Sequence, residues 1–216
     1  MFGRSPWPRR FLASAASIAG ARVTVVGKAP RPGSLIVANH ISWLDILVLG
    51  GATGCAFVSK DQLGHSLVHW LADQNHTIYV DRTARRQVGE QAAALTSALE
   101  RGQIVAFFPE GTVGPGDRLL PFRAPLFAAV NGGCFEVRPV AIDYGAAATE
   151  ISWFQEPTVA NILRVIGRRG TLPVTVRLLD RLRCGDRKQL AREAGEEIAD
   201  ALGFKSPAYS PIGGEK

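Results

Sequence analysis

Short apolar segments alternate along this chain with longer segments of helical periodicity, and this alternation constrains the fold more than any other feature. Strands are expected at 22–26, 34–37, 55–58, 77–80, 104–108, 137–142 and 174–178. Helices are expected at 39–49, 63–71, 85–101, 126–130 and 187–202. Strands separated by helices favour a parallel sheet with helices on its faces. The sequence therefore predicts an α/β fold with a central, mostly parallel β-sheet flanked by helices.

The size and composition of the chain indicate one folded domain. Its 216 residues are enough to bury a core without disulfides, and 46% hydrophobic against 20% charged residues exclude a disordered chain. No stretch reaches the roughly 18 consecutive apolar residues of a membrane-spanning helix. The three cysteines, Cys55, Cys134 and Cys184, are odd in number and include no CxxC pair. This pattern excludes zinc-finger and thioredoxin-like sites and favours a reducing cytosol.

Positive charge is concentrated at the N-terminus. The first acidic residue is Asp45, and the six basic residues before it account for the net charge of +6, because the remainder has 19 basic and 19 acidic residues. These six are Arg4, Arg9, Arg10, Arg22, Lys28 and Arg31. A basic arm beside apolar residues suits an anionic membrane surface, and nucleic acid would attract the same charge. We predict that residues 1–32 form a membrane-associating arm; a merely solvated terminus and a short signal peptide are the alternatives.

A histidine and an aspartate follow the strand expected at 34–37. A carboxylate that accepts a hydrogen bond from an imidazole fixes its tautomer, so His40 and Asp45 are candidates for a general-base pair. Residues five apart in one continuous helix are roughly 140° out of phase. The two side chains can therefore meet only if His40 lies at the turn between strand and helix and Asp45 reaches back to it. The alternative is a capping histidine and an aspartate on the surface of a helix.

Two further strands lead into polar residues. The apolar strand at 104–108 is followed by Glu110, Gly111 and Thr112, so the Glu110 carboxylate is directed at a loop; a simple turn with a capping threonine would give the same pattern. The strand at 77–80 is followed by Arg82, whose guanidinium suits a phosphate. A surface salt bridge is the alternative for this arginine.

Four sequence blocks occur in a defined order: NHISWLD at 39–45, YVDR at 79–82, FFPEGT at 107–112 and VRPVAI at 137–142. They resemble the NHx4D, arginine-bearing, FPEGT and proline-centred blocks of the glycerolipid acyltransferases, specifically the bacterial 1-acylglycerol-3-phosphate (lysophosphatidic acid) acyltransferases. LPFR at 120–123 is similar to a basic segment that follows FPEGT in that family. Each block alone is a weak signal, whereas the ordered set is specific.

The resemblance implies a glycerolipid-acyltransferase-like fold with a seven-stranded sheet, and direct attack of an acceptor hydroxyl on an acyl thioester. His40 would act as the general base and Asp45 would orient it. The arginine-bearing block and the FPEGT block would hold the acceptor phosphate, and two more basic residues would be further contacts. The implied substrate-binding residues are Arg82, Glu110, Gly111, Thr112, Lys60 and Arg123. Glu110 would bind a glycerol hydroxyl or position Arg82, and backbone N–H groups around Gly111 would face a phosphate or an oxyanion.

No metal and no cofactor are expected, because a thioester is already activated. The acyl donor would be a thioester of acyl carrier protein or of coenzyme A. His65 and His69 are four residues apart on an expected helix and have the spacing of two metal ligands. No third ligand is evident for them, and an ordinary helix face is the simpler interpretation.

The sequence thus predicts an enzyme at the cytoplasmic face of the inner membrane that acylates lysophosphatidic acid to phosphatidic acid, with no nucleic-acid partner. Residues 33–205 would form the acyltransferase domain and 206–216 a flexible tail. Where the family often has a basic residue after FPEGT, residues 113–116 are VGPG, and Arg118 is a candidate replacement. Another lysolipid, such as lyso-ornithine lipid, is therefore an alternative acceptor. A non-catalytic lipid- or nucleic-acid-binding module is the alternative from a different class.

A second apolar segment lies at 151–166. It leads into a basic stretch, since residues 164–188 contain eight basic residues against Asp180 and Asp186. Apolar residues beside basic ones predict a second membrane contact, or a docking patch for an acidic acyl carrier protein.

Overall fold

A seven-stranded β-sheet in the order β1-β7-β6-β2-β5-β3-β4 runs through the molecule. It is seen in a computed structural model that describes residues 7–60, 78–80, 87–130 and 135–208. The strands are β1 (Ala21–Gly27), β2 (Leu35–Ala38), β3 (Ala56–Lys60), β4 (Ile78–Val80), β5 (Val105–Phe107), β6 (Val137–Asp143) and β7 (Leu172–Leu178). Neighbouring strands are parallel except β6 and β7, which pair antiparallel. The predicted α/β fold with a mostly parallel sheet is confirmed.

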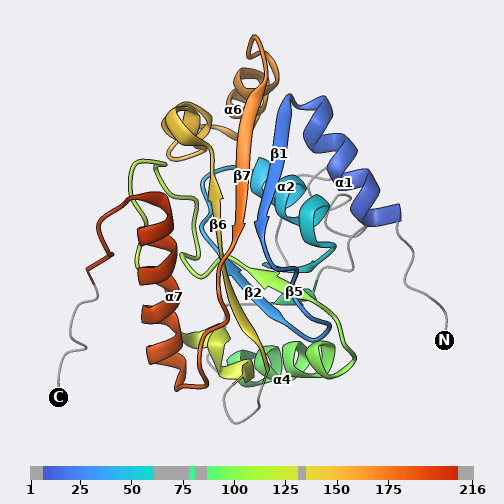
Figure 1. Cartoon of the computed structure of the whole chain (residues 1–216), viewed down its shortest axis with the longest axis vertical. Helices are drawn as coiled ribbons and strands as arrows, with labels where there is room; N and C mark the ends of the chain where they lie inside the picture. The colour runs from blue at the N-terminus through green and yellow to red at the C-terminus, as the bar shows by residue number, and fades with distance from the viewer. Residues whose placement is uncertain (1–6, 61–77, 81–86, 131–134, 209–216) are drawn as a thin grey trace.

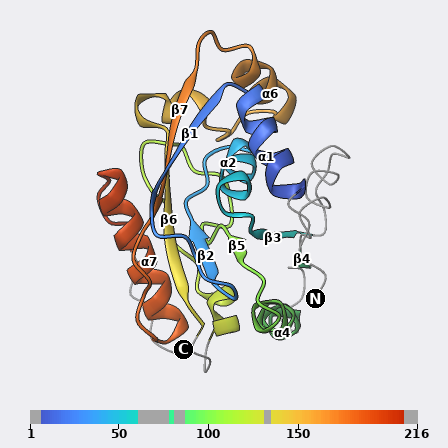
Figure 2. The same cartoon turned by 45° about the vertical axis from the view of Figure 1, so that its right-hand side comes forward.

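Helices cover both faces of the sheet, as Figures 1 and 2 show. One layer contains α1 (Trp7–Ile18) and α2 (Leu44–Thr53), and the other contains α4 (Gln87–Glu100), the 3-10 helix η1 (Pro125–Val130) and α7 (Arg187–Leu202). Three short elements follow β6: η2 (Gly145–Ala147), α5 (Ala148–Ile151) and α6 (Thr158–Ile166).

Strand β2 shows why the core has two halves. All four of its residues are buried. Leu35 and Val37 pack with the layer of α4 and α7, whereas Ile36 and Ala38 pack with the layer of α1 and α2. Successive side chains of a strand point to opposite faces, so a strand that is apolar throughout belongs in the middle of a sheet covered on both sides.

Several helix boundaries agree closely with their prediction. α7 begins after Asp186, whose carboxylate accepts hydrogen bonds from the backbone N–H groups of Lys188 and Gln189, and it ends at the left-handed Gly203. α4 ends at Gly102, as predicted, where φ is +75°. The helix predicted at 63–71 lies outside the described residues.

The first two strands do not form a hairpin. The short Pro/Gly segment between them suggests neighbours, but β1 pairs with β7 along its full length and is separated from β2 by β7 and β6. β1 therefore belongs to the sheet, although it lies within residues 1–32, the segment predicted to be a membrane-associating arm. That role and the domain division at 32 and 205 remain predictions.

Two of the longer described helices, α1 and α6, were not expected from the sequence, and neither were the short η2 and α5. α1 packs against α2, and this contact is close because an added Cβ at Gly51 would lie 2.8 Å from the backbone N and Cα atoms of Ala13. Arg9 strengthens the same contact, because its guanidinium donates hydrogen bonds to the carbonyl oxygens of Gly51 and Ala52 at 3.1 and 2.9 Å. α6 is the second unexpected helix.

Candidate active site

The carboxyl ends of three adjacent parallel strands bring the candidate catalytic residues together. His40 follows β2, Glu110 follows β5, and Tyr144 follows β6 directly. Parallel strands end at the same edge of a sheet, which is where loops commonly form binding sites. Segments about 70 and 100 residues apart in the chain thus meet around one imidazole.

His40 and Asp45 lie in contact, as the sequence predicts for a histidine in the turn between strand and helix. Nδ1 of His40 lies 2.8 Å from Oδ2 of Asp45. A carboxylate accepts and does not donate, so Nδ1 carries a proton, and in the neutral imidazole Nε2 then keeps its lone pair. The imidazole is 16% exposed, whereas the Asp45 side chain is fully buried. A partly open imidazole with a free Nε2 has the form that a general base requires.

The helix after β2 begins later than predicted, and this delay allows the pair to form. α2 starts at Leu44 rather than at Asn39, so His40 lies in the turn before it. Asp45 Oδ2 also accepts hydrogen bonds from the backbone N–H groups of Ile41 and Ser42, at 2.7 and 2.9 Å, which holds that turn in place.

Asn39, the first residue of the helix predicted at 39–49, lies outside α2. Its side chain is buried and bonds to the backbone of Ile142 on β6, donating to the carbonyl oxygen at 3.0 Å and accepting from the N–H at 2.8 Å. A side chain thus replaces the strand pairing where β2 ends, and it fixes the starting point of the His40 turn against β6.

Tyr144 is a site residue that the sequence analysis missed. Its hydroxyl donates a 2.6 Å hydrogen bond to Asp45 Oδ1, so both oxygens of that buried carboxylate are engaged. Burial, followed by the negative charge of Asp45, raises the pKa of Tyr144 well above its usual value, and the hydroxyl keeps its proton to donate. The available signal was its position directly after a buried central strand, which is the position that singles out the other site residues.

Phe108 covers the ring of His40. The two ring centroids are 4.1 Å apart and nearly parallel, with 13° between the planes, and Phe57 stacks behind Phe108 at 5.9 Å. Stacking restricts rotation of the imidazole, so its plane is set by Phe108 and its direction by Asp45.

Glu110 is placed differently from the role predicted for it. The residue is 2% exposed and both carboxylate oxygens are engaged: Oε1 accepts from the His40 backbone N–H at 2.8 Å and Oε2 from that of Leu120 at 3.0 Å. Burial raises the pKa of the Glu110 carboxyl to about 8, against the lowering effect of these two hydrogen bonds. In this structure Glu110 fastens the His40 turn to the loop after β5, and its role in binding a substrate stays a prediction.

The neighbouring residues of the FPEGT block form a turn beside Arg123. Gly111 has φ of +73°, and its backbone N–H donates to the Phe108 carbonyl oxygen at 3.2 Å, so this N–H is engaged within the turn. An added Cβ at Gly111 would lie 3.4 Å from Arg123 Cδ, which places the exposed Arg123 side chain over the glycine. Thr112 is also exposed. Gly111 and Arg123 therefore lie next to each other in the loop after β5, and the substrate-binding role of Gly111, Thr112 and Arg123 stays a prediction.

Other predicted site residues are less fully placed. Lys60 ends β3 and pairs with Val80 of β4, and Arg82 lies outside the described residues, as do His65 and His69. Arg118, the candidate replacement for a missing basic residue, is exposed and paired with its neighbour Asp117. Within the described part of the chain, no group of three or more His, Cys, Asp or Glu side chains is arranged to hold a metal ion.

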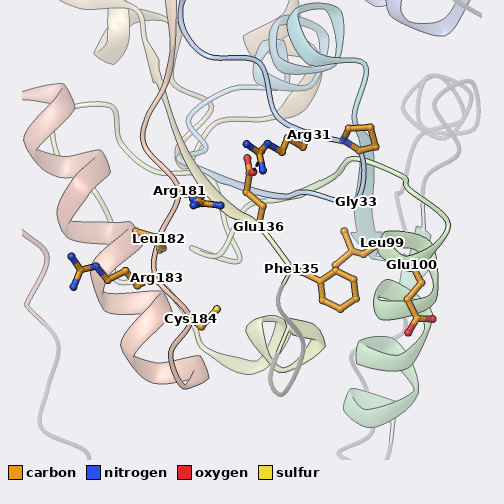
Figure 3. Close-up of a pocket in the computed structure, with 11 residues that line it drawn as sticks. Arg31, Gly33, Leu99, Glu100, Phe135, Glu136, Arg181, Leu182, Arg183 and Cys184 are labelled. Carbon is orange, nitrogen blue, oxygen red and sulfur yellow. Dashed lines mark ion pairs between the residues drawn. The ribbon is translucent and has the colours of Figure 1, made fainter.

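The basic stretch at 164–188 does not form one patch. Arg168 and Arg169 precede β7, and Arg181 and Arg183 follow it, so the length of a strand separates the two pairs. The second pair lines a groove of about 590 Å³ together with Arg31 and Glu136 (Figure 3). This groove lies where β2 and β6 begin, at the edge of the sheet opposite His40. It is therefore separate from the candidate active site.

None of the helices in the described ranges is long and apolar enough to cross a membrane.

Comparisons with known proteins identify the family and the fold. The acyltransferase family model matches residues 22–143, a range that contains His40, Asp45 and Glu110. The crystal structure of the 1-acyl-sn-glycerophosphate (LPA) acyltransferase from Thermotoga maritima is similar with a TM-score of 0.66 and covers 91% of this chain and 77% of that chain. At 22% sequence identity this likeness shows a shared fold.

Curated relatives extend along most of the chain. A lyso-ornithine lipid O-acyltransferase from Rhizobium meliloti (strain 1021) is 33% identical over 217 residues, covering 90% of this chain and 74% of the relative. One from Pseudomonas aeruginosa is 33% identical over 190 residues, covering 83% and 72%. A 1-acyl-sn-glycerol-3-phosphate acyltransferase from Neisseria gonorrhoeae is 38% identical over 114 residues, covering 52% and 44%. With a family model over more than half of its length and relatives along most of it, this chain is an enzyme of the acyltransferase family, in the glycerolipid group that its motifs predict.

Proposed function

We propose that this enzyme transfers a fatty acyl group from a thioester to the free hydroxyl of a lysolipid, with His40 as the general base. The observation that carries the proposal is the His40–Asp45 pair, in which the carboxylate holds Nδ1 and the neutral imidazole keeps its lone pair on Nε2. Nε2 takes the proton of the acceptor hydroxyl as its oxygen attacks the thioester carbonyl. The carbon–sulfur bond then breaks, an ester forms, and the proton passes from His40 to the leaving thiolate.

The neighbouring side chains keep the base oriented through this proton transfer. Asp45 holds Nδ1 and, in turn, is held by Tyr144 and two backbone N–H groups. Phe108 keeps the ring in plane. A base fixed in this way loses little orientational entropy when the acceptor arrives, which is how positioning lowers a barrier. The donor is a thioester of acyl carrier protein or coenzyme A, and the reaction needs no cofactor.

The loop after Glu110 is relevant to which head group the acceptor carries. Gly114 donates its backbone N–H to the His40 carbonyl oxygen at 2.6 Å and accepts from Ser152 Oγ at 2.8 Å. An added Cβ at Gly116 would lie 2.6 Å from the Ala148 carbonyl oxygen. Residues 113–116 thus pack between the His40 turn and α5, and they provide no basic side chain for a phosphate.

Two acceptors are candidates. Lyso-ornithine lipid is favoured because relatives named for it align with 83–92% of this chain, and because residues 113–116 lack a basic side chain. Lysophosphatidic acid is favoured by the 38% identity to the Neisseria gonorrhoeae relative over 114 residues. We place lyso-ornithine lipid first, since its support spans the larger part of the chain.

The location proposed for the enzyme is the cytoplasmic face of the inner membrane, as a peripheral protein. Its acceptor is a membrane lipid, and the N-terminal arm carries six basic residues and no acidic one. The buried Cys55 and the exposed Cys184 are both in the thiol form, which suits a reducing compartment.

The test is acyl transfer by purified protein with labelled palmitoyl and oleoyl thioesters and a panel of lysolipids. We expect His40→Ala to lower turnover by roughly 10²–10⁴-fold while the protein stays folded, and Asp45→Asn to lower it by a similar order. Asp117→Asn, at an exposed acidic residue paired only with Arg118, is the control and should leave turnover unchanged. A folded His40→Ala variant with wild-type turnover would refute the mechanism. Phosphatidic acid as sole product would make lysophosphatidic acid the acceptor.

A further inference from the structure

One face of α6 is apolar and points away from the protein. Val159, Leu163 and Ile166 are 61%, 67% and 57% exposed. Residues at i, i+4 and i+7 fall within about 60° of one another on a helix, so the three form a continuous stripe, called here the α6 stripe. The opposite side of the helix carries the buried Asn161 and Val165. A short helix that buries polar Asn161 and exposes its large apolar residues is the reverse of an ordinary surface helix.

Hydrogen bonds fix α6 to the active-site loop. Asn161 Oδ1 accepts from the indole N–H of Trp43 at 3.1 Å, and Asn161 Nδ2 donates to the Ser152 carbonyl oxygen and to Glu156, both at 2.9 Å. The backbone N–H of Trp153 donates to the Ile41 carbonyl oxygen at 2.8 Å. Trp43 and Ile41 belong to the turn between His40 and Asp45. The orientation of α6 is therefore set by the same turn that holds the catalytic base.

The α6 stripe lies at the same edge of the sheet as His40. β6 and β2 run parallel and end at this edge, and α6 follows β6. Both views place α6 and the C-terminal end of α1 at one end of the molecule (Figures 1 and 2). α1 ends at Ile18, which is highly exposed. Phe154, in the loop before α6, is partly exposed. Exposed apolar residues thus gather around the end where the site opens.

The charge around the stripe is complementary to an anionic surface. No acidic residue occurs from 157 to 179, whereas Arg164, Arg168, Arg169 and Arg177 lie within that range. Arg164 and Arg168 are paired with Glu156 and Glu150, and the exposed Arg169 lies just beyond the helix. An apolar stripe bordered by arginines is the composition of a helix that lies in a membrane interface.

We propose that the α6 stripe inserts into the surface of an anionic lipid bilayer and holds the entrance of the His40 site against it. This inference rests on the proposed function, because a lysolipid acceptor lies in the membrane and must reach His40 from there. A stripe of three side chains is too small for a stable dimer, which buries on the order of 1,200–2,000 Å². A bilayer needs no matching partner surface, and the arginines beside the stripe, with Arg169 outside any ion pair among the described residues, suit its charge.

The experiment measures binding of the full chain to vesicles of phosphatidylcholine with one quarter phosphatidylglycerol, and in parallel its turnover. The test variant is Leu163→Glu with Ile166→Glu, because both side chains are exposed and no core contact is lost. The matched control is Ala93→Glu with Ala94→Glu, at two exposed residues of α4, which lies in the other helix layer and outside residues 1–32. A second test variant, Val159→Trp, should increase binding, since tryptophan favours the membrane interface.

We expect the double variant to bind these vesicles at least tenfold more weakly and the control to bind like the wild type. Turnover of a lysolipid embedded in vesicles should fall in parallel. Turnover of a short-chain lysolipid below its critical micelle concentration should stay at the wild-type level. Wild-type vesicle affinity in the double variant would overturn the proposal, and so would a dimer in light scattering that this variant dissociates. Absence of turnover with every acceptor would instead refute the proposed function, because vesicle binding is measured independently.

Discussion

The Asp45 carboxylate organises the candidate site at the scale of single residues. It accepts hydrogen bonds from the His40 ring, two backbone N–H groups and the Tyr144 hydroxyl. Three of these donors come from the turn before α2, and the fourth comes from the end of β6. Tyr144 is thus the one donor that ties the turn to another strand. Its loss should move Asp45 without removing it.

Replacing Tyr144 with phenylalanine tests that role. The variant keeps the buried ring and removes the hydroxyl that donates to Asp45 at 2.6 Å. We expect kcat to fall about 10- to 100-fold with little change in KM, because a displaced Asp45 orients His40 less well. The free energy of unfolding should fall by about 1–3 kcal/mol, since a buried hydrogen bond to a charged group is lost. Steady-state kinetics and urea unfolding measure the two effects. A variant with wild-type kcat would show that Tyr144 is dispensable for orientation.

At the scale of elements, the close packing of α1 on α2 depends on a single residue, Gly51. Gly51 lies on α2, and a Cβ atom added to it would be only 2.8 Å from the backbone of Ala13. Gly54 ends the same helix in a left-handed conformation and faces only the flexible Arg9 side chain. The two glycines therefore serve different purposes, one for close approach and one for the end of the helix.

Gly51→Ala should separate α1 from α2. Alanine favours a helix over glycine by about 1 kcal/mol, but overpacking against a backbone typically costs about 1–3 kcal/mol. We therefore expect a net loss of stability, seen as a lower urea midpoint with an unchanged slope. Gly54→Asn is the control, because asparagine tolerates the left-handed conformation, and it should cost less. Equal midpoints for Gly51→Ala and the wild type would contradict the contact.

The molecule as a whole carries a buried acid whose ionisation is coupled to folding. Glu110 has its pKa raised from 4.5 to about 8 by burial between the His40 turn and the loop after β5. The folded protein therefore binds the proton over a range in which the unfolded chain has released it. The stability from this group is fully present below about pH 4.5 and is lost as pH rises towards 8.

Glu110→Gln should flatten this pH dependence. The amide does not titrate, so the decline in unfolding free energy between about pH 5 and 8 should be smaller in the variant than in the wild type. The variant should also be less stable at low pH by about 1–3 kcal/mol, because the amide has a single oxygen for the two backbone N–H groups. Urea unfolding at several pH values compares the slopes. Parallel curves for the two proteins would show that Glu110 does not carry the dependence.

Much of the fold and part of the site were predictable from local sequence. All seven strands of the described sheet and the boundaries of α4 and α7 follow periodicity and capping residues within a few positions. The motifs identify His40, Asp45 and the family. α1 was missed because alanine and serine dilute its apolar face, and α6 was missed because it has only nine residues and its apolar positions were interpreted as a membrane contact without a helix.

The sequence by itself determined the alternation of strands and helices, the order of the four motifs and the position of a histidine directly after a buried strand. These features are local, because side-chain periodicity and turn residues act over a few positions. Only the tertiary structure decided that β1 lies beside β7, that Tyr144 reaches Asp45 and that Glu110 binds backbone rather than facing solvent. Those outcomes join segments 70 to 150 residues apart, and they depend on how the whole sheet pairs and closes.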